Sequence, residues 1–127
     1  EELPKYFVEL PGLILKTSMV ISGKDAMVRA DAKTVARFTV EVLKTCVPDQ
    51  IAGVVFLSGG QSPDEATKNF DEIAKLEPLP WPLAFSFSRA LQNDALEIWA
   101  GKDENIHDAQ KAFLGRLQEN SLADQGL

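Results

Sequence analysis

The alternation of short apolar runs with longer amphipathic segments is the feature that most constrains the fold. Apolar runs occupy residues 13–15, 52–57 and 83–87. The middle run, from Ala52 to Leu57, is continuous and rich in β-branched and aromatic residues, which is typical of a strand covered on both faces. Because helical patterns separate the runs, we expect parallel strands joined by helical crossovers, which is an α/β fold.

Two of the helical segments carry start signals. Asp31 is positioned to cap a helix over residues 31–46, and Pro48 predicts where that helix stops. Ser62 and Glu65, with Pro63 between them, predict a capping box for a helix over residues 62–75. The stripe expected to face the core of the first helix consists of Ala32, Val35, Ala36, Val42, Leu43 and Cys46.

Two further helices are expected after the third apolar run. The first would end at Gly101, because glycine favours the left-handed conformation that terminates helices. Their apolar positions are Leu91, Ala95, Ile98 and Trp99 for the first helix, and Ile106, Ala109, Phe113 and Leu117 for the second.

Charge and cysteine content narrow the possible partners and compartment. The net charge is −6 and the isoelectric point is about 4.7, which disfavours nucleic acid as a partner. No apolar run approaches the roughly 20 residues needed to cross a bilayer, so we expect no membrane partner. The single Cys46 cannot form an internal disulfide, which fits a reducing, cytoplasmic location. The chain begins at Glu1 without an initiator methionine, so we expect a longer polypeptide.

Polar residues follow each apolar run, where the chain would leave the sheet. Lys16 follows the first run, Ser58, Gly59 and Gly60 follow the second, and Ser88 with Arg89 follow the third. Active sites of parallel α/β folds lie at the carboxyl ends of the strands, so these groups should face one pocket. A Ser-Gly-Gly turn before a helix can bind phosphate, and it can equally be a plain tight turn.

Lys16 has two readings. A lysine after Leu-Ile-Leu should be partly buried, and burial favours the neutral amine that attacks a ketone to form an imine. Alternatively, the side chain follows the strand surface and reaches water without any chemical role.

Several other polar or aromatic residues are expected to be structural. Cys46, Trp81 and Trp99 should be packing residues, whereas His107, Asp71 and Glu72 should face solvent. Asp25, Arg29 and Asp31 could line the loop after Lys16, in contact with a substrate or with water. The sequence holds one histidine, which disfavours a histidine metal site, and we expect neither a metal nor another cofactor.

Four segments of the chain resemble class I fructose-bisphosphate aldolases, which form a Schiff base with their substrate. They read LILKTSMV at 13–20, FLSGGQS at 56–62, FSFSRALQ at 85–92 and NSLADQG at 120–126. The family fold is a (β/α)₈ TIM barrel. By this resemblance, residues 1–127 form the C-terminal part of one barrel domain, namely the last three βα units (strands 6–8) and the C-terminal helices.

The resemblance also implies a reaction and a set of site residues. The family reversibly cleaves fructose 1,6-bisphosphate to dihydroxyacetone phosphate and glyceraldehyde 3-phosphate, in glycolysis and gluconeogenesis, without a metal. Lys16 falls on the imine-forming lysine. The positions that fall on the substrate phosphate site are Ser58, Gly59, Gly60, Ser88 and Arg89.

The sequence departs from the family at the edges of these motifs. Thr17 and Ser18 stand where the family usually has Pro-Asn, Pro11 where it has Glu, and Ser88 where it has Gly. A related Schiff-base aldolase for another ketose phosphate, or a non-catalytic sugar-phosphate-binding remnant, are therefore alternatives.

The family's general acid–base carboxylates lie on earlier strands, so we expect this chain alone to be incomplete and inactive. Its expected partners are the sugar phosphate, the N-terminal part of the same barrel and identical subunits in a homo-oligomer, a tetramer by resemblance. In isolation, four strand residues would be candidates for exposure, namely Leu15, Val54, Phe56 and Phe85.

Overall fold

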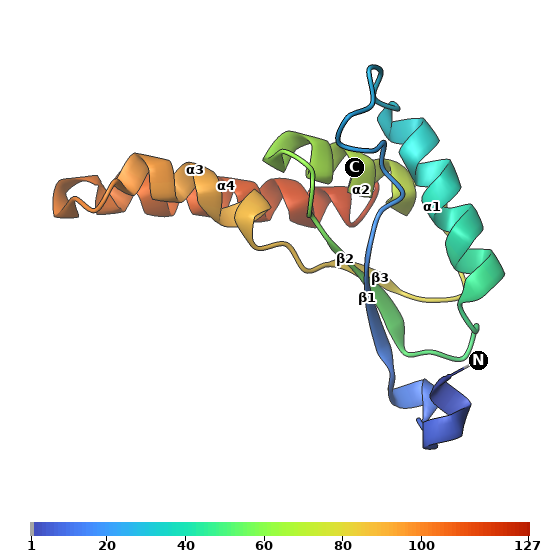
Figure 1. The fold of residues 1–127 in the computed structure, drawn as a ribbon. Helices are drawn as coiled ribbons and strands as arrows, with labels where there is room; N and C mark the ends of the chain where they lie inside the picture. Colours follow the sequence, from blue (N-terminus) through green and yellow to red (C-terminus); the bar gives the residue numbers. More distant parts are fainter. Residues whose placement is uncertain (1) are drawn as a thin grey trace.

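A computed structural model of the chain describes residues 2–127. The elements in order are η1 (Leu3–Tyr6), η2 (Leu10–Gly12), β1 (Ile14–Ser18), α1 (Ala32–Cys46), β2 (Gly53–Leu57), α2 (Pro63–Ala74), β3 (Leu83–Phe85), α3 (Arg89–Trp99), η3 (Asp103–Asn105) and α4 (Ile106–Ala123). The three strands form one parallel sheet in the order β1-β2-β3, which confirms the predicted α/β alternation (Figure 1).

The register of the sheet sorts the strand residues onto two faces. Leu15 pairs with Val54, and Val54 pairs with Leu83. Successive strand residues point to opposite faces. One face therefore carries Leu15, Thr17, Val54, Phe56, Leu83 and Phe85, and the other carries Ile14, Lys16, Ser18, Val55, Leu57 and Ala84.

The first of these faces packs against the helices and forms the core. Val54 and Phe56 are completely buried, and the Phe56 ring lies edge-on to Phe70 of α2 with centroids 5.9 Å apart. Phe85 and Phe87 contact the same Phe70 ring, at 6.0 and 6.1 Å. The expected exposure of Val54 and Phe56 is therefore wrong, because α1 and α2 of this chain already cover that face. Leu15 and Phe85 are half-buried.

Helix α1 begins as predicted, but its buried stripe differs from the predicted one. The Asp31 carboxylate accepts a hydrogen bond from the Thr34 N–H at 2.8 Å. The buried residues are Val35, Ala36, Thr39, Val40 and Leu43. Val42 and Cys46 are exposed, so their predicted core positions are wrong. Thr39 can join the buried stripe because its hydroxyl is satisfied there: it donates to the Val35 carbonyl at 2.7 Å and accepts from the Val20 N–H at 2.9 Å.

Helix α2 has the predicted capping box. The Ser62 hydroxyl accepts from the Glu65 N–H at 3.2 Å, and the Glu65 carboxylate accepts from the Ser62 N–H at 2.8 Å. Asp71 and Glu72 are only half-exposed, and both pair with Lys75, so the prediction that they face solvent is only partly right. Trp81 is a packing residue as expected, since it is 1% exposed and its Nε1 donates to the Pro48 carbonyl.

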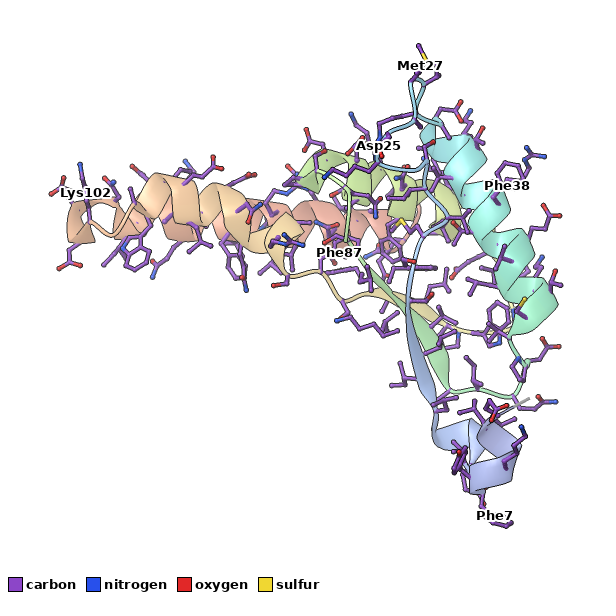
Figure 2. All side chains as sticks on the ribbon, viewed as in Figure 1. Phe7, Asp25, Met27, Phe38, Phe87 and Lys102 are labelled. Carbon is purple, nitrogen blue, oxygen red and sulfur yellow. The ribbon has the colours of Figure 1, made fainter. Side chains whose placement is uncertain are left out.

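Helices α3 and α4 run side by side and project away from the sheet (Figure 1). Trp99 is 42% exposed, so its predicted packing role is wrong within the described residues. It lines an apolar hollow between the two helices. His107 is exposed, as expected. Figure 2 shows Phe7 and Met27 at the tips of the molecule, where both side chains are exposed. None of the helices described is long and apolar enough to span a membrane.

Candidate functional site

The parallel sheet brings the segments after β2 and β3 to one edge. The Ser86 N–H donates to the Phe56 carbonyl at 2.8 Å, which extends the ladder one residue beyond β3. Beyond this point the chain from β2 turns into α2 and the chain from β3 turns into α3. The site predicted from the sequence therefore lies between two helix N-termini.

A polar cavity of about 310 Å³ lies at this edge. Its lining includes three of the predicted site residues, Ser58, Gly60 and Arg89. Gln61 and Asn93 complete the lining, and the sequence interpretation had missed both. Asn93 lies four residues after Arg89 on α3, so the two side chains share one helix face. That spacing was a signal in the sequence, because it was available once Arg89 had been selected.

The glycine loop has a backbone that fits its role in the turn. Gly60 has φ +77°, a conformation that side chains disfavour, and a Cβ there would lie 3.1 Å from Ile21 Cδ1. A Cβ on Gly59 would lie 3.1 Å from Leu57 Cδ1. The turn is closed by the Gln61 N–H, which donates to the Ser58 carbonyl at 3.2 Å. Because Gly59 and Gly60 have no side chains, a ligand in the cavity could approach the backbone of this turn closely.

The two helix N-termini differ in their capacity to bind an anion. The first turn of α2 is already capped by Ser62 and Glu65, and Asp64 adds a second carboxylate. Within the described residues, the Ser88 side chain does not cap α3, and no acidic residue lies in the first turn of that helix. Free N–H groups and the positive end of the helix dipole favour anions. The first turn of α3 is therefore the more favourable of the two helix N-termini for an anion, and it lies beside the Ser58 and Gly60 lining of the cavity.

Lys16 lies in the middle of β1, on the sheet face opposite the helix core. Its Nζ donates to Ser86 Oγ at 3.1 Å. Ser86 directly follows β3, and β2 lies between β1 and β3 in the sheet. The partial burial expected from the sequence is not observed, because Lys16 is exposed in this chain. The strand also continues through Ser18, so Lys16 is not a strand-end residue. The Ser86 contact links Lys16 to the segment that leads into Ser88 and Arg89.

Arg29 reaches across from the loop after β1. Its Nη2 donates to the Gly60 carbonyl at 3.3 Å, and its Nε lies 3.4 Å from Glu65 Oε1. The hydrogen bond from the Ser62 N–H, with Arg29 nearby, lowers the pKa of Glu65. Arg29 therefore fixes the back of the glycine turn. The sequence had left open whether Asp25, Arg29 and Asp31 act on a substrate, and Asp31 instead caps α1.

Comparisons with known proteins point to one family. A sequence model of class-I fructose-bisphosphate aldolase matches residues 1–127. Cytosolic fructose-bisphosphate aldolase 4 of Arabidopsis thaliana is 46% identical over 125 residues, which cover 98% of this chain and 32% of that protein. The fructose-bisphosphate aldolase of Dictyostelium discoideum is 41% identical over 98% of this chain and 35% of its own length.

A solved structure agrees with the sequence matches. It is fructose-bisphosphate aldolase from Plasmodium falciparum, in complex with TRAP and a small-molecule inhibitor. The TM-score is 0.85 at 44% identity, over 89% of this chain and 33% of that chain. The present chain thus spans about a third of the length of these relatives. The relatives include cytosolic and chloroplastic proteins, so the expected cytoplasmic location stays a prediction.

Proposed function

Because this chain belongs to the class-I fructose-bisphosphate aldolase family, we propose that the complete protein reversibly cleaves fructose 1,6-bisphosphate to dihydroxyacetone phosphate and glyceraldehyde 3-phosphate. The observation that carries the proposal is the cavity that Ser58, Gly60 and Arg89 line together. These residues come from two segments about thirty positions apart, and the parallel sheet brings them to one polar hollow. Its lining suits a phosphate ester.

We assign the covalent step to Lys16. Its neutral amine adds to the C2 ketone, and loss of water gives a protonated imine. The imine accepts the electron pair of the C3–C4 bond as that bond breaks, once the C4 hydroxyl has lost its proton. Glyceraldehyde 3-phosphate leaves, and the remaining enamine takes up a proton and is hydrolysed to dihydroxyacetone phosphate. The Ser86 hydroxyl, 3.1 Å from Nζ, can orient the amine.

We assign substrate phosphate binding to Arg89, Ser58, Gly59, Gly60 and Ser88. Arg89 would supply a charge-assisted contact, and the Ser58 hydroxyl a weaker neutral one. The uncapped first turn of α3 would add backbone N–H groups. Ser88 is exposed beside Arg89, and its side chain lies where the family usually has glycine. It could therefore crowd the phosphate and change which ketose phosphate is preferred.

We propose that residues 1–127 are the C-terminal three βα units of a single TIM-barrel domain. The parallel order β1-β2-β3 supports this arrangement, because neighbouring strands of such a barrel follow one another in sequence. The rest of the barrel would cover the sheet face that carries Ile14 and Lys16, and it would supply the acid–base carboxylates. The chain alone would then be inactive. Assembly of complete subunits into a homo-oligomer is a further expectation from the family.

The test is a cleavage assay on the complete protein, with the bisphosphate compared with fructose 1-phosphate. Arg89→Ala should reduce kcat/KM for the bisphosphate by about 2–4 kcal/mol of transition-state stabilisation, the scale of a lost charge-assisted contact in a closed site. Arg37→Ala removes an exposed arginine on α1 and serves as the control. Parental kinetics for Arg89→Ala would contradict the assigned site. A preference for the monophosphate would favour a related aldolase, and no cleavage of either would favour a non-catalytic remnant.

A further inference from the structure

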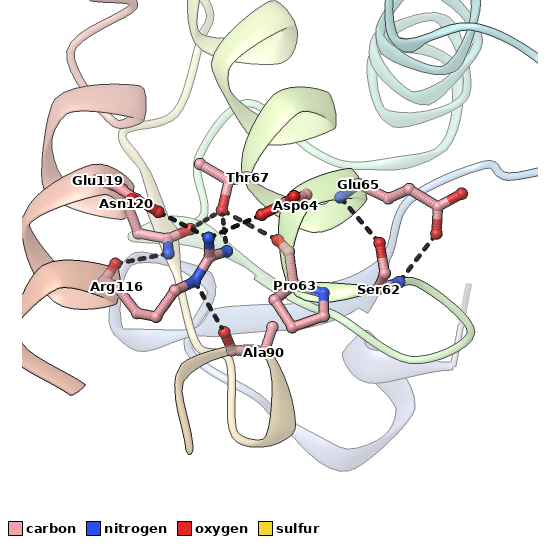
Figure 3. A network of polar contacts seen from close by, with 9 residues as sticks. All are labelled: Ser62, Pro63, Asp64, Glu65, Thr67, Ala90, Arg116, Glu119 and Asn120. Atoms are coloured by element: carbon pink, nitrogen blue, oxygen red, sulfur yellow. Dashed lines mark hydrogen bonds and ion pairs between the residues drawn. The ribbon is translucent and has the colours of Figure 1, made fainter. Parts of the chain in front are cut away.

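Arg116 of α4 is a buried arginine that contacts all three helices around the candidate site (Figure 3). It is 7% exposed, although it carries a full charge. A buried guanidinium is stable only where carboxylates and other acceptors satisfy its five donors. The acceptors that satisfy Arg116 lie mostly on segments distant from it in the sequence.

The partners of Arg116 lie on both helices that border the cavity. On α2, Nη1 donates to Asp64 Oδ1 at 2.9 Å and Nη2 donates to Thr67 Oγ1 at 2.8 Å. On α3, Nε donates to the Ala90 carbonyl at 3.4 Å. On α4 itself, Figure 3 shows one contact of the guanidinium, with Glu119, whose Oε2 lies 2.6 Å from Nη1. One planar group thus connects the first turns of α2 and α3.

The lining of the cavity lies next to these two first turns. Ser58, Gly60 and Gln61 come directly before α2, and Arg89 is the residue next to Ala90. The distance between Arg89 and the Ser58–Gly60 turn therefore depends on the relative positions of α2 and α3. Asn120 adds a second link between α4 and α2, because its Oδ1 accepts from Thr67 Oγ1 at 3.1 Å.

We propose that Arg116 is a positioning residue for phosphate binding. It does not line the cavity, but it sets the separation of the two helix N-termini so that Arg89 and the Ser58–Gly60 turn reach one phosphate group. This inference rests on the phosphate site of the proposed function. A lysine keeps the charge but has no planar fork, so it cannot reach α2 and α3 together.

The experiment uses the complete protein and three variants. Arg116→Lys removes the fork. Thr67→Val removes one partner on α2, as a milder variant. Gln118→Ala changes an exposed residue of α4 that is not among the hydrogen-bond partners of Arg116, so it is the control. For each variant, KM and kcat for bisphosphate cleavage, binding of inorganic phosphate by calorimetry, and the thermal midpoint are measured.

Arg116→Lys should raise KM and the dissociation constant of inorganic phosphate in parallel, each by about 10-fold. The reason is that Arg89 and the Ser58–Gly60 turn would no longer reach one phosphate together, which costs roughly one charge-assisted contact. The kcat of this variant should stay within about two-fold, because Lys16 lies on β1, which makes none of the hydrogen bonds of Arg116. Thr67→Val should give a change of about three-fold in the same two quantities, and Gln118→Ala should match the parent. A purely structural residue would lower the thermal midpoint without this paired shift.

Arg116→Lys that folds and shows parental KM and phosphate affinity would overturn the inference while leaving the proposed function intact. If Arg116→Lys fails to fold, Thr67→Val decides on the same two constants, and parental values there overturn the inference. A parent protein that binds phosphate but cleaves neither sugar phosphate would refute the proposed reaction only. In that case the calorimetric comparison still tests Arg116. A parent that neither cleaves nor binds phosphate would refute both.

Discussion

The two faces of the three-stranded sheet differ in what this chain provides for them. On the helix side, Val54 and Phe56 are fully buried beneath α1 and α2. On the other side, Ile14 is 61% exposed, and Lys16 stands among residues that the described chain covers only in part. The packing that holds this chain together and the lysine proposed for chemistry thus lie on opposite faces of the same strands.

Alternation along a strand thus separates core packing from the position proposed for chemistry. Because neighbouring strand residues point to opposite faces, Leu15 can anchor β1 in the core while Lys16 is exposed on the other face. Within residues 2–127, the helices bury Val54 and Phe56 of the first face completely. The face with Lys16 is finished only if other parts of the protein pack against it, as the barrel proposal requires.

The largest expected effect is at Phe56 on the covered face. Phe56→Ala in the complete protein should lower the free energy of unfolding by about 3–5 kcal/mol, the usual cost of removing a buried aromatic ring. The loss would remove one of the edge-on contacts of Phe70, which also packs against Phe85 and Phe87. Phe38→Ala on the outer side of α1, where the ring is 43% exposed, is the control and should change stability little. Thermal denaturation of both variants measures the difference, and equal midpoints would contradict the assignment of the core.

Ile14, on the face that carries Lys16, reports directly whether other parts of the protein cover that face. If the rest of a barrel covers its face, Ile14→Ala should destabilise the complete protein by about 2–4 kcal/mol, as for a buried aliphatic side chain. If that face is open to water in the complete protein, the cost should stay within about 0.5 kcal/mol. We expect the larger value. Denaturant unfolding distinguishes the two, and the smaller value would contradict the barrel proposal.

The smallest effect concerns Asp124, which follows α4 away from both sheet faces. Burial, with the charge of Glu77 nearby, raises the pKa of Asp124, and its Oδ1 lacks a hydrogen-bond partner among the described residues. An acid with a raised folded-state pKa binds its proton more tightly when folded, so stability is lost as pH rises through that pKa. Asp124→Asn should therefore stabilise at pH 7 by at most about 0.5 kcal/mol.

The gain from Asp124→Asn should shrink as pH falls below the raised folded-state pKa, and it should vanish below the ordinary pKa of the carboxyl, where Asp124 is neutral in both the folded and unfolded states. Thermal midpoints across a pH series measure this. Glu119→Gln, on the exposed side of α4, is a comparison variant without the same burial. A gain for Asp124→Asn that grows toward acid pH would contradict the assigned direction of the shift.

Local signals in the sequence predicted the elements well. Asp31, Ser62 and Glu65 cap helices where expected, because capping depends on residues only three positions apart. The parallel sheet followed from the alternation of apolar runs. Which face of a strand or helix is buried was harder, since it depends on the neighbour that packs there. Val54, Phe56 and the exposed Cys46 were misjudged for that reason.

The candidate site was predictable only in part. Ser58, Gly60 and Arg89 were found from their motifs and lie around one cavity. Arg116 could not be found in this way, because its partners Asp64 and Thr67 lie 52 and 49 residues away in the sequence. The burial of Lys16 was overestimated, because a strand residue is buried only by what faces it, and this chain supplies little on that side.

The most direct test of the account is reductive trapping on the complete protein. Dihydroxyacetone phosphate is added with borohydride, which reduces an imine to a stable amine, and the modified peptide is sequenced by mass spectrometry. The account predicts a single adduct on Lys16, and no adduct when the ketone phosphate is left out. An adduct on a different lysine, or no adduct in a protein that cleaves the bisphosphate, would contradict the assignment of Lys16 as the imine-forming residue.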